Sequence, residues 1–346
     1  MKKKGFTLVE LLAVIVILAI IALIATPIIL GVIEKAKKGA AESSALGYVD
    51  AVEKQIAINL LDEDATNDIK DRAYSVEELN NLGVSVKGTV PSNGTIEIKN
   101  GEVKNYILGI DGYAVENGKA TKPSNTKKYE NGYDVYYNPV SGEKCSASDA
   151  ISTTGQTTGC MKWYVFNDSE GSSTVNVILD HNTTARVAWN TVGQYGTNVA
   201  YADSNIKPEV DKLVSASNWK SMPRLITAEE VNKITGKTGW TNKSGWYCLE
   251  SKVQDSTSSP YCNNSGSLGW LYDHTNCVEG SNDWKCTTND TATYGYWTST
   301  TYGNAGSGSD VWRVSRTGAL STRVANDASY GVRPVITISK SIVSKQ

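Results

Sequence analysis

Histidine is scarce in this chain of 346 residues, which carries 2 His. His181 and His274 each follow an aspartate, which raises the question of a metal or general-base role. Neither has a third partner at a readable spacing, so we expect both to be surface or loop residues. The sequence also has no Gly-x-Ser-x-Gly elbow and no Gly-rich phosphate loop. It therefore predicts no enzyme activity, no metal site and no cofactor.

An excess of basic residues is missing as well. The chain has 34 Lys+Arg against 36 Asp+Glu, a formal net charge of -2, and no basic face is evident, so nucleic acid is not an expected partner. Phenylalanine is rare, with 2 residues against 9 Trp and 18 Tyr. Trp and Tyr suit surfaces that meet ligands, and they are also common strand residues, so both interpretations stay open.

Cysteine is absent before residue 145, and no Cys-x-x-Cys pair occurs, which disfavours a zinc site. An even number of cysteines downstream of a membrane segment fits disulfides in an oxidising compartment. Six free thiols are the alternative. Neighbouring cysteines would close short loops, which predicts the pairs Cys145 with Cys160, Cys248 with Cys262, and Cys277 with Cys286.

Charge is missing from Leu11 to Ile33, a run of 23 residues. At about 1.5 Å rise per residue, a helix over this run is long enough to cross a hydrocarbon core of about 30 Å. Lys2, Lys3 and Lys4 precede the run and predict a cytoplasmic N-terminus, with the bulk of the chain outside.

Helical periodicity continues beyond the apolar run. The apolar residues then recur at the i, i+3, i+4 spacing of an amphipathic helix that packs on a domain: Ala45, Tyr48, Val49, Val52, Ile56 and Leu60. A secretory signal peptide would have a shorter apolar stretch that ends at a small-residue cleavage site. We therefore expect one helix of about 50 residues that begins in the membrane and ends as the spine of a globular unit.

Two residues do not fit a plain membrane anchor. Glu10 places a carboxylate at the start of the apolar run, where an ionisable group is expensive and needs a positive partner. The free N-terminal amine of a neighbouring subunit could be this positive partner. Pro27 lies inside the apolar helix, where it removes a backbone hydrogen bond and predicts a kink or a locally melted stretch.

The run Lys-Gly-Phe-Thr-Leu-Val-Glu at 4–10 resembles the leader and processing site of type IV prepilins and pseudopilins. The resemblance covers about residues 1–60. It implies a leader at 1–5 that a prepilin peptidase removes after Gly5, followed by methylation of the new terminal Phe6. It also implies that Glu10 pairs with a neighbour's terminal amine during assembly and that Pro27 is the helix-kinking proline of the filament core.

Residues 6–61 would then form the pilin helix, with its transmembrane segment at 11–33, and 62–118 a small antiparallel pilin sheet. Ser75-Val-Glu-Glu78 is a capping box for a short helix that ends at Gly83. Asn100-Gly101 is a strong hairpin signal between strands at 95–99 and 102–110, and a third strand is expected at 112–116. The polar segment 119–132 is expected to be a linker.

Residues 133–346 differ in composition from the preceding part: they are rich in Gly, Ser, Thr, Asn and Trp and hold all the cysteines. We expect strands at 163–166, 175–179, 185–189, 296–299, 311–315, 319–324 and 332–338, with helices within 207–220 and after the capping box that begins at Thr227. Tyr-Trp-Thr-Ser-Thr at 296–300 and Tyr-Gly-Val-Arg-Pro-Val-Ile at 330–336 resemble surface domains with a C-type-lectin-like fold. The calcium–sugar motifs of that fold do not match, and Arg333 is expected to tie the terminal strand to the core.

The predicted fold is α+β: a long N-terminal membrane and spine helix, a small pilin sheet and a disulfide-containing, C-type-lectin-like domain. The predicted function is a pilin-like subunit of a type IV pilus that carries a display or adhesion domain, with a pseudopilin of a type II secretion or competence system as the alternative. Expected partners are the prepilin peptidase and methylase, other pilin subunits, the membrane before assembly, and a host or surface ligand. The chain would begin as a single-pass membrane protein and end at the cell surface.

Overall fold

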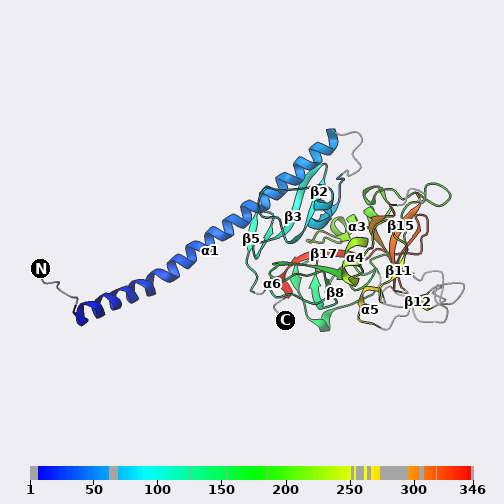
Figure 1. The fold of residues 1–346 in the computed structure, drawn as a ribbon. Helices are drawn as coiled ribbons and strands as arrows, with labels where there is room; N and C mark the ends of the chain where they lie inside the picture. Colours follow the sequence, from blue (N-terminus) through cyan, green and yellow to red (C-terminus); the bar gives the residue numbers. More distant parts are fainter. Residues whose placement is uncertain are drawn as a thin grey trace.

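The computed structural model describes residues 7–61, 69–124, 126–153, 155–184, 186–250, 253–254, 261–262, 266–272, 295–303, 308–316 and 318–343. A single long helix, α1, projects from a globular body that is packed around its C-terminal half (Figure 1). The body has two parts. We call α1 with the sheet that follows it, residues 8–121, the helix–sheet unit, and residues 133–343 the C-terminal unit.

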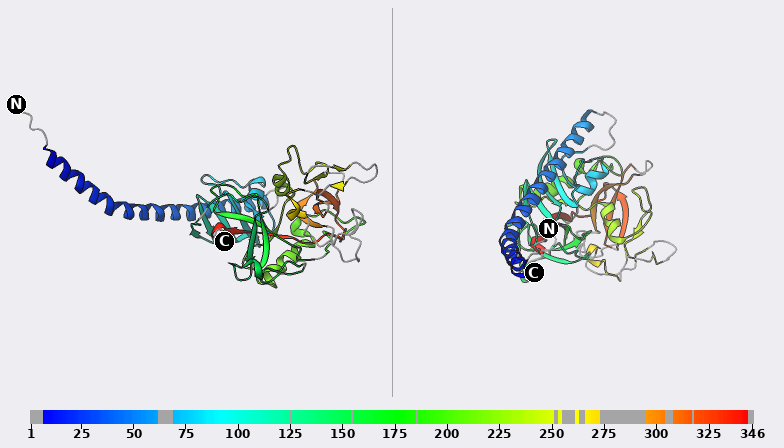
Figure 2. Two further views of the ribbon diagram at one scale, coloured as in Figure 1. Left: turned by 90° about the horizontal axis from the view of Figure 1, so that it is seen from below. Right: turned by 60° about the vertical axis from the view of Figure 1, so that its left-hand side comes forward.

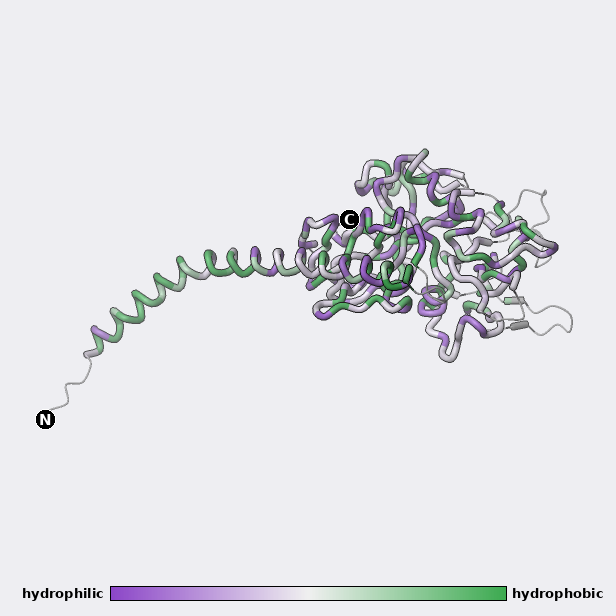
Figure 3. Tube along the Cα trace, turned by 90° about the horizontal axis from the view of Figure 1, so that it is seen from above, coloured by the Kyte–Doolittle hydropathy of each residue, from purple (hydrophilic) through white to green (hydrophobic). Residues whose placement is uncertain are grey.

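Helix α1 spans Leu8–Leu61, so the expected single helix is confirmed. Its N-terminal half stands free, and the tube in Figure 3 is almost continuously hydrophobic there. Its C-terminal half buries one stripe against the sheet: Ala41, Ala45, Tyr48, Val49, Val52 and Ile56. The stripe ends one turn earlier than predicted, because Leu60 lies beyond the sheet and is 76% exposed.

Pro27 lies inside α1 without interrupting it. Of the two predicted alternatives, a kink or a locally melted stretch, the melted stretch is not formed, and the helix instead curves along its free half (Figure 2). The Thr26 hydroxyl donates to the Ala22 carbonyl oxygen at 2.6 Å, a bond one turn back that is associated with gentle bending. One lost backbone bond is thus accommodated within a continuous helix.

The helix–sheet unit has a five-stranded antiparallel sheet in the order β1-β2-β3-β4-β5. Its strands are β1 Ala73–Ser75, β2 Asn93–Lys99, β3 Glu102–Ile110, β4 Tyr113–Glu116 and β5 Lys119–Thr121, with the short helix α2 Val76–Asn81 after β1. Ser75 and Glu78 form the predicted capping box of α2, and Asn100-Gly101 makes the predicted hairpin with positive φ at both residues.

The expected linker at 119–132 begins with a strand instead. Asn117 and Gly118 both adopt positive φ, so they form a second tight hairpin that pairs β5 with β4. The Asn-Gly signal that predicted the first hairpin is present here too. The connection between the two units is correspondingly shorter.

The C-terminal unit is built on a six-stranded sheet in the order β10-β17-β9-β8-β6-β7 and a four-stranded sheet in the order β11-β16-β15-β14. The strands of the first are β6 Asp134–Asn138, β7 Glu143–Lys144, β8 Met161–Phe166, β9 Thr174–Leu179, β10 Arg224–Leu225 and β17 Pro334–Ser339. Those of the second are β11 Tyr247–Cys248, β14 Gly295–Thr301, β15 Asp310–Ser315 and β16 Ala319–Val324, and β12 Val253–Gln254 pairs with β13 Tyr261–Cys262. The helices are η1 Ala147–Asp149, η2 Tyr201–Asp203, α3 Ile206–Ser215, α4 Ala228–Thr235, α5 Gly269–Tyr272 and α6 Lys340–Val343.

One predicted strand is not formed. The described residues of the 185–189 segment are irregular, and only Thr184 makes an isolated bridge, to Val332. Trp189 is fully buried, its indole packs against Trp297, and its ring N–H donates to the Val199 carbonyl oxygen. The apolar pattern at this position therefore reflects an aromatic anchor in the core and not a strand.

Two disulfides join Cys145 to Cys160 and Cys248 to Cys262, in agreement with the predicted neighbour pairs. Cys277 and Cys286 lie outside the described residues, so the third pair stays a prediction. Arg333 is fully buried and its guanidinium donates to the carbonyl oxygens of Leu179, Trp270 and Leu271, which confirms its role in tying the terminal strand to the core.

Of the two positions expected for His181, surface or loop, the structure shows the loop. It follows β9, its side chain is 1% exposed, and its Nε2 lies 3.0 Å from the Gln156 carbonyl oxygen. Burial lowers its pKa from the usual value. His274 lies outside the described residues.

Candidate functional site

The free half of α1 presents an apolar surface on every side. From Leu11 to Ile33 each side chain is exposed except Ala25, which is intermediate. A helix that is hydrophobic all round needs a membrane or other helices around it. Within the described residues, α1 is the one helix whose length and composition suffice to cross a membrane.

Glu10 lies at the beginning of this surface and is held by Thr7. The Thr7 N–H and hydroxyl donate to Glu10 Oε2 at 2.9 and 2.8 Å, and the Glu10 N–H donates to Thr7 Oγ1 at 3.3 Å. This is a reciprocal capping box, Thr-x-x-Glu, at the first turn of the helix. The same signal predicted the helices after Ser75 and Thr227. Here, at Thr7, it was not predicted, and it fixes the orientation of the proposed assembly residue.

Gly5 and Phe6, the expected processing residues, lie outside the described residues. Pro27 is 17 positions beyond Glu10 on the same helix, which is roughly 25 Å along its axis. The structure therefore does not bring the two expected assembly residues together. Glu10 lies at the beginning of the apolar surface, and Pro27 lies further along it.

The free half of α1 has a defined direction because the helix is fixed where it meets the sheet. Glu42 Oε1 accepts a hydrogen bond from the Ala120 N–H of β5 at 3.0 Å. The Tyr113 hydroxyl donates to the Glu34 carbonyl oxygen at 3.5 Å, and Lys122 Nζ lies 3.7 Å from the Glu34 carboxylate. The strand that was missed in the sequence is thus part of what holds the spine.

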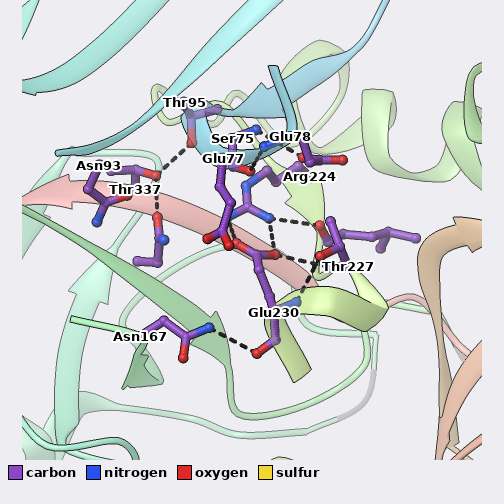
Figure 4. A network of polar contacts seen from close by, with 12 residues as sticks. Ser75, Glu77, Glu78, Asn93, Thr95, Asn167, Arg224, Thr227, Glu230 and Thr337 are labelled. Carbon is purple, nitrogen blue, oxygen red and sulfur yellow. Dashed lines mark hydrogen bonds and ion pairs between the residues drawn. The ribbon is translucent and has the colours of Figure 1, made fainter. Parts of the chain in front are cut away.

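The two units also meet through a polar interface that the sequence analysis did not predict (Figure 4). On the side of the C-terminal unit, Arg224 and Glu230 form a buried ion pair, with nitrogen–oxygen distances of 2.7 and 2.6 Å and 1% and 4% of the side chains exposed. Burial alone would lower the pKa of Arg224, but the Glu230 carboxylate outweighs it and the pKa lies above its usual value.

Residues of the helix–sheet unit complete this interface. Burial would raise the pKa of Glu78, but Arg72 at 3.0 Å and Arg224 of the C-terminal unit hold it below its usual value. The hydroxyls of Thr95 in β2 and Thr337 in β17 lie 2.6 Å apart and are buried. The two units are therefore docked through charges and hydrogen bonds, and the chain between them is not their sole connection.

No group of three His, Cys, Asp or Glu side chains that could hold a metal ion occurs within the described ranges.

A family model described as the prokaryotic N-terminal methylation motif matches residues 1–26. No curated protein matches this chain, and no solved structure does. The match covers the residues expected to form the leader, the Thr7–Glu10 turn and most of the apolar surface. Together with the long apolar helix, it supports a type IV pilin-like or pseudopilin subunit, which is a structural protein, and it implies processing by a prepilin peptidase.

Proposed function

We propose that this chain is a subunit of a type IV pilus, inserted in the membrane as a precursor, trimmed after Gly5 and polymerised through the free half of α1. The C-terminal unit is then displayed on the filament surface for adhesion. The observation that carries the proposal is the division of α1 into two halves. The matched motif lies on the half that is apolar on all sides, and the other half is built into a folded body.

Assembly follows from the physical chemistry of the free half. In the precursor the exposed run from Leu11 to Ile33 is shielded by lipid, and in a filament the same surface packs against neighbouring helices. Cleavage after Gly5 creates an amine at Phe6, four residues before Glu10. A carboxylate of one subunit and an amine of the next neutralise one another in the apolar core, which favours the correct axial register.

Display of the C-terminal unit is supported by the way it is attached. A domain that is docked through ion pairs and a buried hydroxyl contact between the two units keeps a fixed orientation on its spine helix. The resemblance of residues 296–300 and 330–336 to C-type-lectin-like surface domains supports a binding role. These segments include parts of β14 and β17, and an isolated bridge joins Tyr296 to Gly331.

Intact mass of the protein purified from its own cells tests the proposal. We expect a chain that begins at Phe6 and carries one added methyl group. A Gly5→Leu variant should keep residues 1–5 and remain in the membrane, because a bulky side chain blocks the processing site. A wild-type chain that retains Met1 to Gly5 would contradict the proposal.

A further inference from the structure

A cavity of about 340 Å³ lies at the junction of the two units, distinct from the assembly surface. The helix–sheet unit contributes α2 and the start of β2, and the C-terminal unit contributes β9, α4 and the residue after β8. This volume is at the small end of the range for ligand sites, roughly 300–1,000 Å³. Apolar side chains are nearly absent from its wall, which holds five asparagines: Asn80, Asn81, Asn93, Asn167 and Asn176.

The orientation of two of these amides is fixed, because the partner of one can only donate and the partner of the other can only accept. Asn93 Oδ1 accepts from the Gly94 N–H at 2.6 Å, and Asn167 Nδ2 donates to the Glu230 carbonyl oxygen at 2.9 Å. Figure 4 shows both on the same side of the inter-unit network. Their other amide ends, Asn93 Nδ2 and Asn167 Oδ1, have no hydrogen-bond partner among the residues that the structure describes.

Asn176 provides a third amide with one end unpaired, and this residue is 6% exposed. The Thr337 hydroxyl donates to Asn176 Oδ1 at 2.7 Å, and Thr337 lies 2.6 Å from the Thr95 hydroxyl. This chain of hydroxyls crosses from one unit to the other and holds the amide in place. Asn176 Nδ2 is thereby left without a partner in the described part of the chain, on a wall of the cavity.

The charges around the cavity are already paired. Lys233 Nζ lies 3.1 Å from Glu77 Oε2, and Glu230 is engaged with Arg224. A ligand therefore meets neutral amide donors and acceptors, with no unpaired charge to bind an anion or a cation. Neighbouring sugar hydroxyls can each donate and accept. They therefore match the unpaired amide N–H groups of Asn93 in β2 and Asn176 in β9 and the unpaired carbonyl oxygen of Asn167 after β8.

We propose that this asparagine cavity binds a neutral sugar residue, either as a free monosaccharide or as the end of a surface glycan. Net gains per neutral hydrogen bond are small, so the affinity for a single sugar is in the millimolar range. The site requires both units in their docked arrangement. It does not require filament assembly, so it succeeds or fails independently of the assembly mechanism.

The test uses the full chain in lauryldimethylamine oxide micelles, because glycoside detergents would compete. Saturation-transfer NMR measures binding of glucose, galactose, N-acetylglucosamine and the soluble tetramer of N-acetylglucosamine, with glucosamine and glucuronate as charged counterparts. We expect saturable binding of at least one neutral sugar. Binding of the monomer alone indicates a free sugar as the source, and binding of monomer and tetramer indicates a glycan end.

Asn93→Asp is the decisive variant, because it keeps the oxygen that accepts from Gly94 and replaces the unpaired N–H donor. We expect about a tenfold loss of affinity. Asn117→Asp makes the same chemical change at the β4–β5 hairpin, where Oδ1 accepts from the Tyr106 N–H, and should bind as wild type. Asn81→Ala, an exposed wall residue, should also weaken binding.

Three outcomes would overturn the proposal. The first is that no neutral sugar shows saturable binding. The second is that a charged sugar alone binds. The third is that Asn93→Asp and Asn81→Ala both bind as tightly as Asn117→Asp.

Discussion

Thr7 and Glu10 close a reciprocal pair of hydrogen bonds at the first turn of α1, with the Thr7 hydroxyl 2.8 Å from Glu10 Oε2. The carboxylate that the proposed assembly mechanism uses is therefore held in place before any neighbouring subunit arrives. An arriving amine meets a carboxylate whose rotamer is already fixed, which lowers the ordering entropy of the contact.

Thr7→Val should loosen this turn, because valine keeps the shape of threonine and removes its hydroxyl. The loss of a cap of this kind costs about 1 kcal/mol. We expect faster amide hydrogen exchange over the first turn in micelles and a partial loss of filament incorporation. Thr26→Val, which removes a mid-helix hydroxyl bond to Ala22, is the matched control and should leave first-turn exchange unchanged.

Arg224→Met should destabilise the docked body by about 3–5 kcal/mol, because it leaves Glu230 buried without its partner. The double variant Arg224→Met with Glu230→Leu should recover part of that loss. Chemical denaturation of the full chain measures both free energies of unfolding. A loss in the double variant equal to the sum of the losses in Arg224→Met and Glu230→Leu alone would show that the buried pair is not coupled.

Acid should weaken the interface through Glu78. Its folded-state pKa is depressed, so its contribution to stability is present above the unfolded pKa of about 4.3 and is lost as the pH falls through the lower folded-state value. Glu78→Gln should therefore flatten the pH dependence of the free energy of unfolding below that point. Glu77→Gln, at a half-exposed carboxylate in the same helix, should leave the dependence close to wild type.

Gly109→Ala should push the two units apart. A Cβ at this position of β3 would lie 2.8 Å from Thr174 Oγ1 in β9 and 3.1 Å from Ser92 Oγ. We expect a loss of about 1–3 kcal/mol and faster proteolysis of the connection near Lys127 and Lys128. Gly39→Ala in α1, where nothing lies within 4 Å of the added Cβ, should stabilise the helix by about 1 kcal/mol.

Local signals in the sequence predicted most of the fold. The apolar run and its amphipathic continuation predicted α1, while Ser75 and Thr227 predicted the starts of α2 and α4. Strand β5 was missed although Asn117-Gly118 carried the same signal as the first hairpin. The apolar character of the free half of α1 could likewise be predicted, because it depends on composition alone.

The inter-unit interface could not be predicted from these signals. Lys233 and Glu77 are separated by 156 positions, and Thr95 and Thr337 by 242. No periodicity connects such residues, since their contact depends on how two sheets pack. The burial of His181 could not be predicted for a related reason, because it depends on a loop that includes Gln156.

Incorporation of Glu10→Ala into filaments sheared from the cell surface tests the central claim most directly. The control is Asp50→Ala, an exposed carboxylate on the same helix beyond the apolar run. We expect both variants to be processed and to reach the membrane. Asp50→Ala should enter filaments as wild type, and Glu10→Ala should be absent from them. Normal incorporation of Glu10→Ala would contradict the account.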